Sequence, residues 1–167
     1  MMNSGAPKRT LEIAALGERE VVMTRVFNAP RHLVFDALTK PELVKRWLLG
    51  PDGWTMPVCE IDLRVGGKYR YVWRQTSNGK EMGMGGVYRE IVPPERLVHT
   101  ELFDEAWYPG ESLITNTLTE QGGRTTLTTT MLYVSQEARD AILKSGMERG
   151  VEASYDRLAA IVEKTKA

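Results

Sequence analysis

The chain has 167 residues, enough for one domain with a substantial apolar core and no need of disulfide bonds. Its 22 basic and 22 acidic side chains cancel, which argues against a broad basic surface for nucleic acid. The single cysteine, Cys59, excludes an internal disulfide framework, and without a long apolar run or a signal peptide we expect a cytoplasmic protein outside the membrane.

The N-terminal part of the chain predicts an extension that leads into a single domain. Residues 1–18 are expected to be partly disordered, and residues 19–167 to form the domain. Residues 11–16 fit either a short strand or a segment on the surface, and they are too few to decide between the two. Residues 20–27 alternate β-branched side chains and predict the first clear strand.

Two short helices and then a series of strands are predicted next. Pro30 and Pro41 each suit the first position of a helix, and the second helix extends to Trp47. From Trp54 onward, alternation of period two between turn-forming residues predicts an antiparallel meander. Its strands are expected at residues 54–65, 68–75, 81–91, 97–103, 112–120 and 125–134. Together with the first strand they make a sheet of about seven strands.

The stretch from Ser135 to Lys164 predicts one long amphipathic helix. Ser135 suits the N-cap, and an apolar stripe recurs at spacings of three and four residues. The stripe consists of Leu143, Met147, Val151, Ser154, Leu158 and Ile161. Gly146 and Gly150 lie inside this helix, and two explanations are open: close backbone packing with a bend, or room beside the helix for a bound molecule.

These elements imply an α+β fold in which a curved sheet surrounds the long C-terminal helix. Each strand has an apolar face to bury, and one long helix is available to cover those faces. A twisted sheet that curves around the helix meets this demand. Because one helix does not fill the whole concave side, we expect a cavity between sheet and helix.

Several short motifs, spread over residues 20 to 164, resemble one group of proteins. They are RVFNAP at 25–30, VFDA at 34–37, PE at 41–42, KRW at 45–47, DLRVGG at 62–67, GVYREI at 86–91, PERL at 94–97 and SGMERG at 145–150. Their order resembles the SRPBCC, or START-like helix-grip, superfamily, and within it the bacterial branch named for the activator of the ninety-kilodalton heat-shock protein's ATPase. The resemblance implies a helix-grip fold around a hydrophobic cavity. It implies no single activity, because members bind lipids, hormones or polyketides and some are cyclases.

The wall of the expected cavity is rich in aromatic and methionine side chains. Tyr69, Tyr71 and Trp73 alternate with cationic neighbours and are expected to face inward. The other expected wall residues are Trp54, Met56, Met84, Tyr88, Phe103, Met131, Tyr133, Met147, Val151 and Tyr155. Such a wall suits a small hydrophobic molecule, and the alternative is that these side chains simply pack together as core.

His99 and Glu101 form the most distinctive polar pair of the sequence. They are two residues apart on a predicted strand and so share a face, which we expect to be the inner one, with Asn116 joining from the next strand. A solvated outer face is the alternative. A histidine beside a carboxylate suits acid–base catalysis or the binding of a polar ligand group. No cofactor or metal site is expected, because the chain has one cysteine and two histidines.

Three functions are therefore open. Binding of a small hydrophobic molecule is favoured over catalysis of a cyclase or dehydratase kind. The third function is that of a chaperone ATPase cofactor that acts through its surface, with an exposed patch around Trp47 and Leu48 or around Trp107 and Tyr108. A chaperone partner and a homodimer are left open, and neither nucleic acid nor a membrane is expected as a partner.

Overall fold

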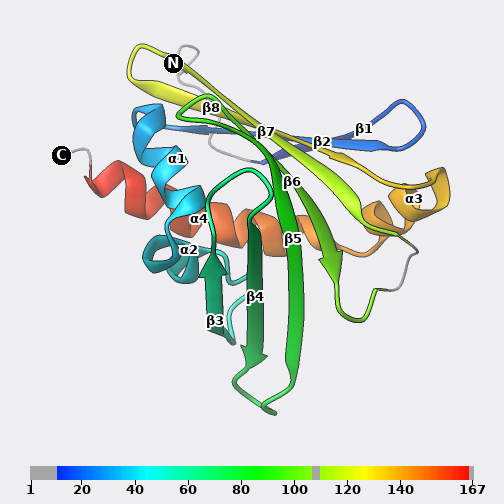
Figure 1. The fold of residues 1–167 in the computed structure, drawn as a ribbon. Coiled ribbons are helices and arrows are strands. Elements are labelled where there is room, and N and C mark those ends of the chain that lie inside the picture. Colours follow the sequence, from blue (N-terminus) through cyan, green and yellow to red (C-terminus); the bar gives the residue numbers. More distant parts are fainter. Residues whose placement is uncertain (1–10, 107–109, 166–167) are drawn as a thin grey trace, which may run out of the picture.

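A computed structural model describes residues 11–106 and 110–165, and within these residues it has one antiparallel sheet of eight strands and four helices (Figure 1). The strands are β1 (Glu12–Leu16), β2 (Glu20–Phe27), β3 (Trp54–Ile61), β4 (Lys68–Gln75), β5 (Glu81–Val92), β6 (Arg96–Phe103), β7 (Ser112–Gln121) and β8 (Arg124–Leu132). Their order in the sheet is β1-β2-β8-β7-β6-β5-β4-β3, so the sheet has two edges and is not closed. The predicted curved sheet around a C-terminal helix is confirmed.

The sheet has one strand more than the sequence predicted. Glu12–Leu16, which the sequence left undecided, pairs with β2 along its length, from Glu12 opposite Thr24 to Leu16 opposite Glu20. The described part of the expected N-terminal extension therefore contains an edge strand. Residues 1–10 lie outside the described residues.

Burial alternates along the strands and identifies the face of the sheet that meets the helices. In β4, Tyr69, Tyr71 and Trp73 are buried, whereas Arg70 between them is only partly buried. The inward orientation predicted for the three aromatic side chains is confirmed. Their cationic neighbours keep their charges near water, as the cost of burying an unpaired charge requires.

Two short helices connect β2 to β3 and pack beside the C-terminal helix. They are α1 (Arg31–Thr39) and α2 (Pro41–Trp47), and Pro41 at the first turn of α2 fits its missing N–H group. The indole Nε1 of Trp47 donates a hydrogen bond to the carbonyl of Ala37 at 2.8 Å, so the buried Trp47 ties α2 to α1. In Figure 1 both helices lie next to the C-terminal half of the last helix.

The predicted C-terminal helix is two helices, which corrects the expectation of a single one. α3 (Gln136–Lys144) begins at the predicted N-cap, where Ser135 Oγ accepts from the amide of Ala138 at 3.1 Å. α4 (Met147–Thr165) follows after Gly146, whose φ is +80°. A right-handed helix cannot continue through that conformation, and glycine adopts it without a Cβ clash.

Gly150 lies within α4 and has a different role. A Cβ on Gly150 would lie 3.3 Å from Cδ of Pro51, so the missing side chain lets the α2–β3 connection approach the helix closely. The same connection is held to α4 by a hydrogen bond of 2.8 Å from the amide of Gly50 to Ser154 Oγ. Of the two explanations for the glycines, the structure supports close packing with a break in the helix.

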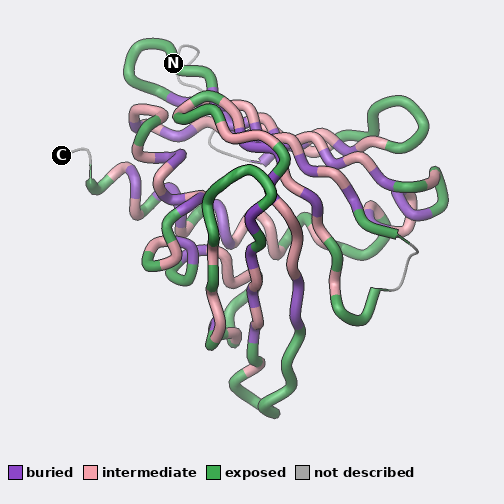
Figure 2. Tube along the Cα trace, in the orientation of Figure 1, coloured by how far each residue is buried: buried purple, intermediate pink, exposed green. Residues whose placement is uncertain are grey.

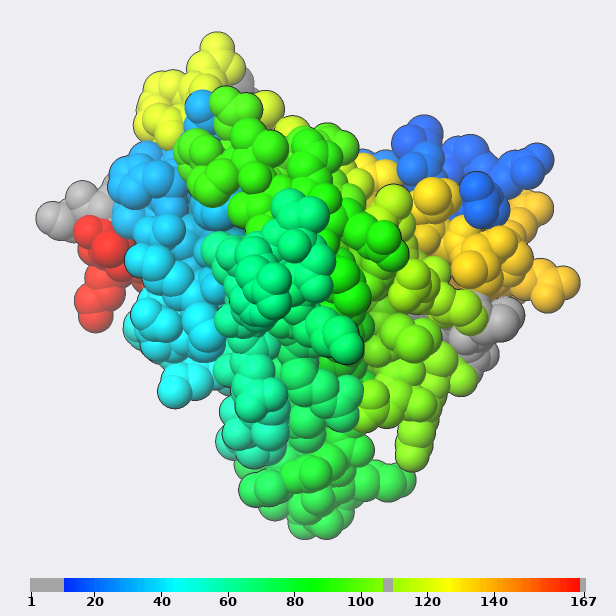
Figure 3. Space-filling view, in the orientation of Figure 1, coloured from blue at the N-terminus to red at the C-terminus, as the bar shows by residue number. Residues whose placement is uncertain are grey.

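The two halves of α4 are packed differently. In the C-terminal half, Tyr155, Leu158 and Val162 are buried, and Leu158 has no exposed surface. In the N-terminal half, Met147 and Val151 remain partly exposed, although they belong to the predicted apolar stripe. Figure 2 shows the alternation of burial along the chain, and in Figure 3 strands β3–β6 lie in front of most of α4 while its red C-terminal end is visible. Among the described residues, no helix combines the length and apolar character needed to cross a bilayer.

Candidate functional site

The inner face of β6 holds the two polar side chains that the sequence singled out. His99 lies opposite Tyr88 of β5 and Ile114 of β7, which are both buried. Glu101 lies opposite the buried Ser112. Because residues directly opposite each other in a sheet share a face, the predicted inward orientation of His99 and Glu101 is confirmed.

A chain of hydrogen bonds crosses the inner face from β8 to β6. Thr129 on β8 donates from Oγ1 to Asn116 Oδ1 on β7 at 2.8 Å. Asn116 Nδ2 lies 3.5 Å from Nε2 of His99. The predicted approach of Asn116 to His99 is therefore confirmed, and Thr129 is a member that the sequence analysis did not include.

The same chain continues from His99 to β4 and assigns the proton of the imidazole. The hydroxyl of Tyr69 donates to the carbonyl of Thr100 at 2.5 Å, so its oxygen is free to accept from His99 Nδ1 at 3.1 Å. Nδ1 then carries the proton, and Nε2 accepts from Asn116. Burial lowers the pKa of His99 to about 4, with the hydrogen bond to Thr100 acting in the opposite direction. His99 is thus a neutral ring whose two nitrogens are both occupied.

We expect the imidazole of His99 to stay neutral, with the proton on Nδ1, from pH 8 down to about pH 5. Long-range ¹H–¹⁵N NMR spectra distinguish this tautomer from the Nε2 tautomer and from the imidazolium. Because the folded-state pKa lies below the ordinary value of 6.5, His99 should also lower the free energy of unfolding as pH falls from 6.5 toward 4, and contribute nothing above 6.5. In the urea-unfolded protein the same ring should protonate near pH 6.5. An imidazole that becomes charged near pH 6.5 in the folded protein would contradict this assignment.

Glu101 is different from its neighbours, because nothing in the described chain donates a hydrogen bond to its carboxyl group. Burial alone raises the pKa of Glu101 to about 7. Its side chain nevertheless keeps some exposed surface. Glu101 is therefore largely enclosed by protein and still partly accessible.

Aromatic rings form the surroundings of His99 and Glu101. The centroid of the Tyr69 ring lies 5.0 Å from that of Tyr71, 5.4 Å from that of Tyr88 and 5.1 Å from that of His99. Burial is the main cause that raises the pKa values of the three tyrosines, so their hydroxyls stay protonated at any physiological pH. A second group of rings holds α4, where Tyr155 lies 5.9 Å from both Phe27 and Trp47.

Arg25 on β2 is an inward charge that the sequence analysis did not single out. Its side chain is 3% exposed and pairs with Asp156 of α4 at 2.9 Å, while that carboxylate is 65% exposed. The guanidinium also lies 5.4 Å from the centroid of the Phe27 ring, which favours a cation. The position of Arg25 in the alternation of β2, between Met23 and Phe27, is the signal that places it on the inner face.

The remaining predicted wall residues are divided between core and partly exposed positions. Those buried are Met56, Met84, Met131, Tyr133 and Tyr155, and those partly exposed are Trp54, Phe103, Met147 and Val151. Trp73 is fixed by a hydrogen bond of 2.7 Å from its Nε1 to the carbonyl of Leu48. The partly exposed members belong to β3, β6 and the N-terminal half of α4.

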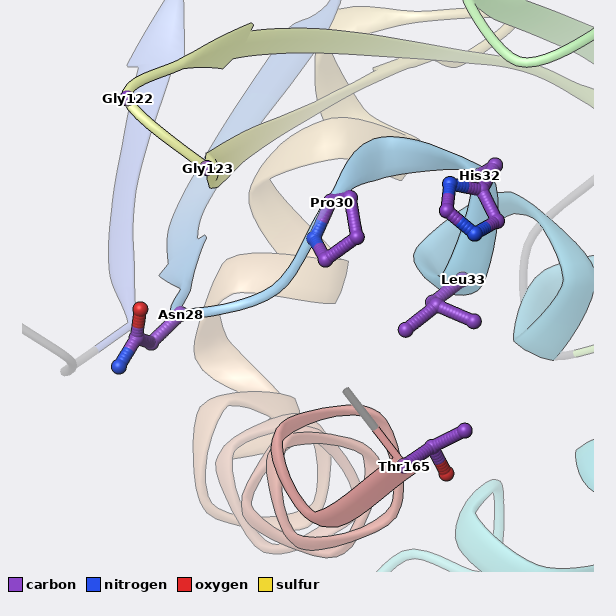
Figure 4. A pocket seen from close by; sticks show the side chains of 7 residues that line it. All are labelled: Asn28, Pro30, His32, Leu33, Gly122, Gly123 and Thr165. Atoms are coloured by element: carbon purple, nitrogen blue, oxygen red, sulfur yellow. The ribbon is translucent and has the colours of Figure 1, made fainter. Parts of the chain in front are cut away.

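Two grooves on the surface are separate from this inner face. One, of about 520 Å³, lies where the β7–β8 turn meets the end of α4, and none of the predicted site residues lines it (Figure 4). The other, of about 660 Å³, lies between the α2–β3 connection and the start of α4. Met147 is the predicted residue that it includes. The lining of the first groove is mixed and that of the second is mainly apolar, and both are open to the surface.

Two expectations linked to the alternative functions can be compared with the described positions. The expected exposure of Trp47 is wrong, because Trp47 is 4% exposed and packs against Tyr155, whereas Leu48 beside it is partly exposed. Trp107 and Tyr108, the other expected patch, lie outside the described residues. His99 and Glu101 are not hydrogen-bonded to each other, so the geometry does not form the expected acid–base pair. Among the described residues, no three side chains are grouped as metal ligands.

Comparison with known proteins identifies the family. The family model for activator of Hsp90 ATPase homolog 1-like proteins matches residues 28–163. A solved protein from Rhodobacter sphaeroides is 33% identical, covers 93% of this chain and 99% of its own, and has a TM-score of 0.86. One from Chromobacterium violaceum is 32% identical, covers 87% of this chain and 97% of its own, and has a TM-score of 0.77.

A more distant structure supports the fold alone. An AHSA1-like protein from Aeromonas hydrophila is 15% identical, covers 84% of this chain and 93% of its own, and has a TM-score of 0.65. A search of curated proteins finds no match. From the extent of the family match, the chain belongs to the family of activator of Hsp90 ATPase homolog 1-like proteins and has their helix-grip fold.

Proposed function

We propose that the protein binds a small, mainly apolar molecule between the inner face of β4–β6 and the N-terminal half of α4. The observation that carries this proposal is the state of Glu101, which is enclosed enough for burial to raise its pKa to about 7 and yet keeps exposed surface. An unpaired carboxyl group in such a place destabilises the fold, so its presence favours a role in binding.

The wall of this space supports the same conclusion. Tyr69, Tyr71 and Trp73 present aromatic surface from β4, and Val151 on α4 is partly exposed. Apolar walls with a few polar groups are typical of sites for small molecules. Membership of the helix-grip family is consistent with this use of the fold, although fold alone does not determine function.

Filling the space should abolish binding. Val151→Trp places a large ring one turn before the buried Tyr155, so we expect it to block the neutral fluorescent probe N-phenyl-1-naphthylamine. The matched control is Ala160→Trp, which puts the same side chain on an exposed position of α4. The probe should fluoresce with the wild type and the control, and lose at least tenfold in affinity for Val151→Trp.

Two results would overturn the proposal. The first is equal affinity of the probe for both variants, which would place its site elsewhere. The second is the absence of any binding by the wild type, together with native mass spectra that contain no co-purified molecule. Circular dichroism and thermal unfolding of both variants establish that each one is folded.

A further inference from the structure

The inner face around Glu101 contains a carboxyl group whose hydrogen-bonding capacity is unused. The hydroxyl of Tyr69 donates to the backbone carbonyl of Thr100. His99 uses both of its ring nitrogens. Within the described chain, Glu101 is left without such a partner. A ligand that enters the space therefore meets the paired polar atoms of Tyr69 and His99 and a carboxyl group that needs a donor.

The rings near Glu101 favour a positive charge at the same place. Burial raises the pKa values of Tyr69, Tyr71 and Tyr155, and the charge of Glu101 raises each of them further. The carboxyl group thus lies within electrostatic reach of rings from both β4 and α4. Faces of aromatic rings attract cations, and the attraction is stronger where water is excluded.

We propose that the molecule bound in this space carries a cationic amine, and that the carboxylate of Glu101 binds this amine; the inference rests on the proposed binding function. An ammonium group supplies several N–H donors and the opposite charge. A neutral alcohol supplies one donor and no charge. An anionic ligand would place two negative charges together in an enclosed space, which is strongly unfavourable.

The other charged groups near the site do not replace Glu101 in this role. Arg25 pairs with Asp156 through Nη1 at 2.9 Å, and its buried Nε, which has no hydrogen-bond partner among the described residues, is a donor on a cation and does not bind an amine. Glu111 is exposed at the surface and lies 3.9 Å from Arg89. The remaining titratable groups that face Glu101 stay neutral from pH 5.5 to 8.5: Cys59, Tyr69, Tyr71, Tyr88, His99 and Tyr155. Among the described groups on this inner face, Glu101 is thus the one that changes charge within that range.

The test uses three probes with one carbon skeleton and different head groups. Isothermal titration calorimetry of the wild type should give 4-phenylbutylamine at least tenfold higher affinity than 4-phenylbutan-1-ol at pH 8, and 4-phenylbutanoate the lowest affinity. The ammonium group stays charged from pH 6 to 8, as an alkylamine with a pKa near 10 does. Glu101 becomes mostly ionised over the same range, so affinity for the amine should rise about tenfold.

Glu101→Gln should remove both the preference for the amine and its pH dependence, while affinity for the alcohol stays within about twofold. Glu105→Gln, at an exposed position after β6, is the matched control and should behave as the wild type. Equal binding of amine and alcohol by the wild type would overturn this inference and leave the proposed function standing. If none of the probes binds and the neutral naphthylamine probe also fails, both the inference and the proposed function are overturned.

Discussion

Glu101→Gln should raise the free energy of unfolding by about 2–3 kcal/mol at pH 8 and leave it nearly unchanged at pH 4. Burial raises the folded-state pKa of Glu101 from the ordinary 4.5 to about 7. A group with a raised folded-state pKa stabilises the fold fully below its unfolded pKa and loses that contribution as pH rises through the folded pKa. The wild type should therefore lose stability between about pH 4.5 and 7, and this loss should be absent in the variant.

Urea unfolding at a series of pH values, followed by circular dichroism, measures the difference directly. Glu105→Gln removes the same charge from an exposed position and should follow the wild-type profile. Parallel profiles for Glu101→Gln and the wild type would mean that the carboxyl group is solvated in the folded protein. That result would remove the main support for an enclosed binding space.

Leu158→Ala should lower the free energy of unfolding by about 3–4 kcal/mol, the largest decrease expected for truncation of an aliphatic side chain in α4. Leu158 has no exposed surface and packs where the helix meets the sheet. A matched pair of valines then compares the two halves of the helix. Val162 is 2% exposed, and Val162→Ala should lower the free energy of unfolding by about 2 kcal/mol. Val151 is partly exposed, so Val151→Ala should lower it by less than about 1 kcal/mol.

Chemical denaturation of the three variants at one pH provides the comparison. If Val151→Ala is as costly as Val162→Ala, the N-terminal half of α4 is packed as tightly as the rest. The space beside Val151 would then be too small for a guest molecule. The valine pair therefore tests the site without any ligand.

Much of the fold follows from local patterns in the sequence. The alternation of Tyr69, Tyr71 and Trp73 with cationic residues correctly predicts the inner face of β4, and the serine at 135 correctly predicts a helix N-cap. These patterns depend on neighbours a few residues away. The break at Gly146 could not be predicted in this way, because an interior glycine is compatible with both a continuous and an interrupted helix.

The site was only partly predictable. The alternation of side chains along β6 places His99 and Glu101 on one face, and the same alternation along β7 places Asn116 on that face. Their different states depend on contacts from distant segments: Tyr69 and Asn116 occupy both nitrogens of His99, while Glu101 receives no donor. The role of Arg25 likewise depends on Asp156, which lies 131 residues further along the chain.

The pairing of β2 with β8 has a consequence for how the molecule folds. Val26 lies opposite Thr126, so β2 and β8, which are adjacent in the sheet, come from positions about a hundred residues apart. During synthesis the first strands emerge long before their partner, and β2 has nothing but β1 to pair with until β8 has left the ribosome. Closing so large a loop is entropically costly, and contacts of this range are associated with slow folding. The hairpin of β1 and β2 is thus the segment most in need of protection from wrong pairing in the nascent chain.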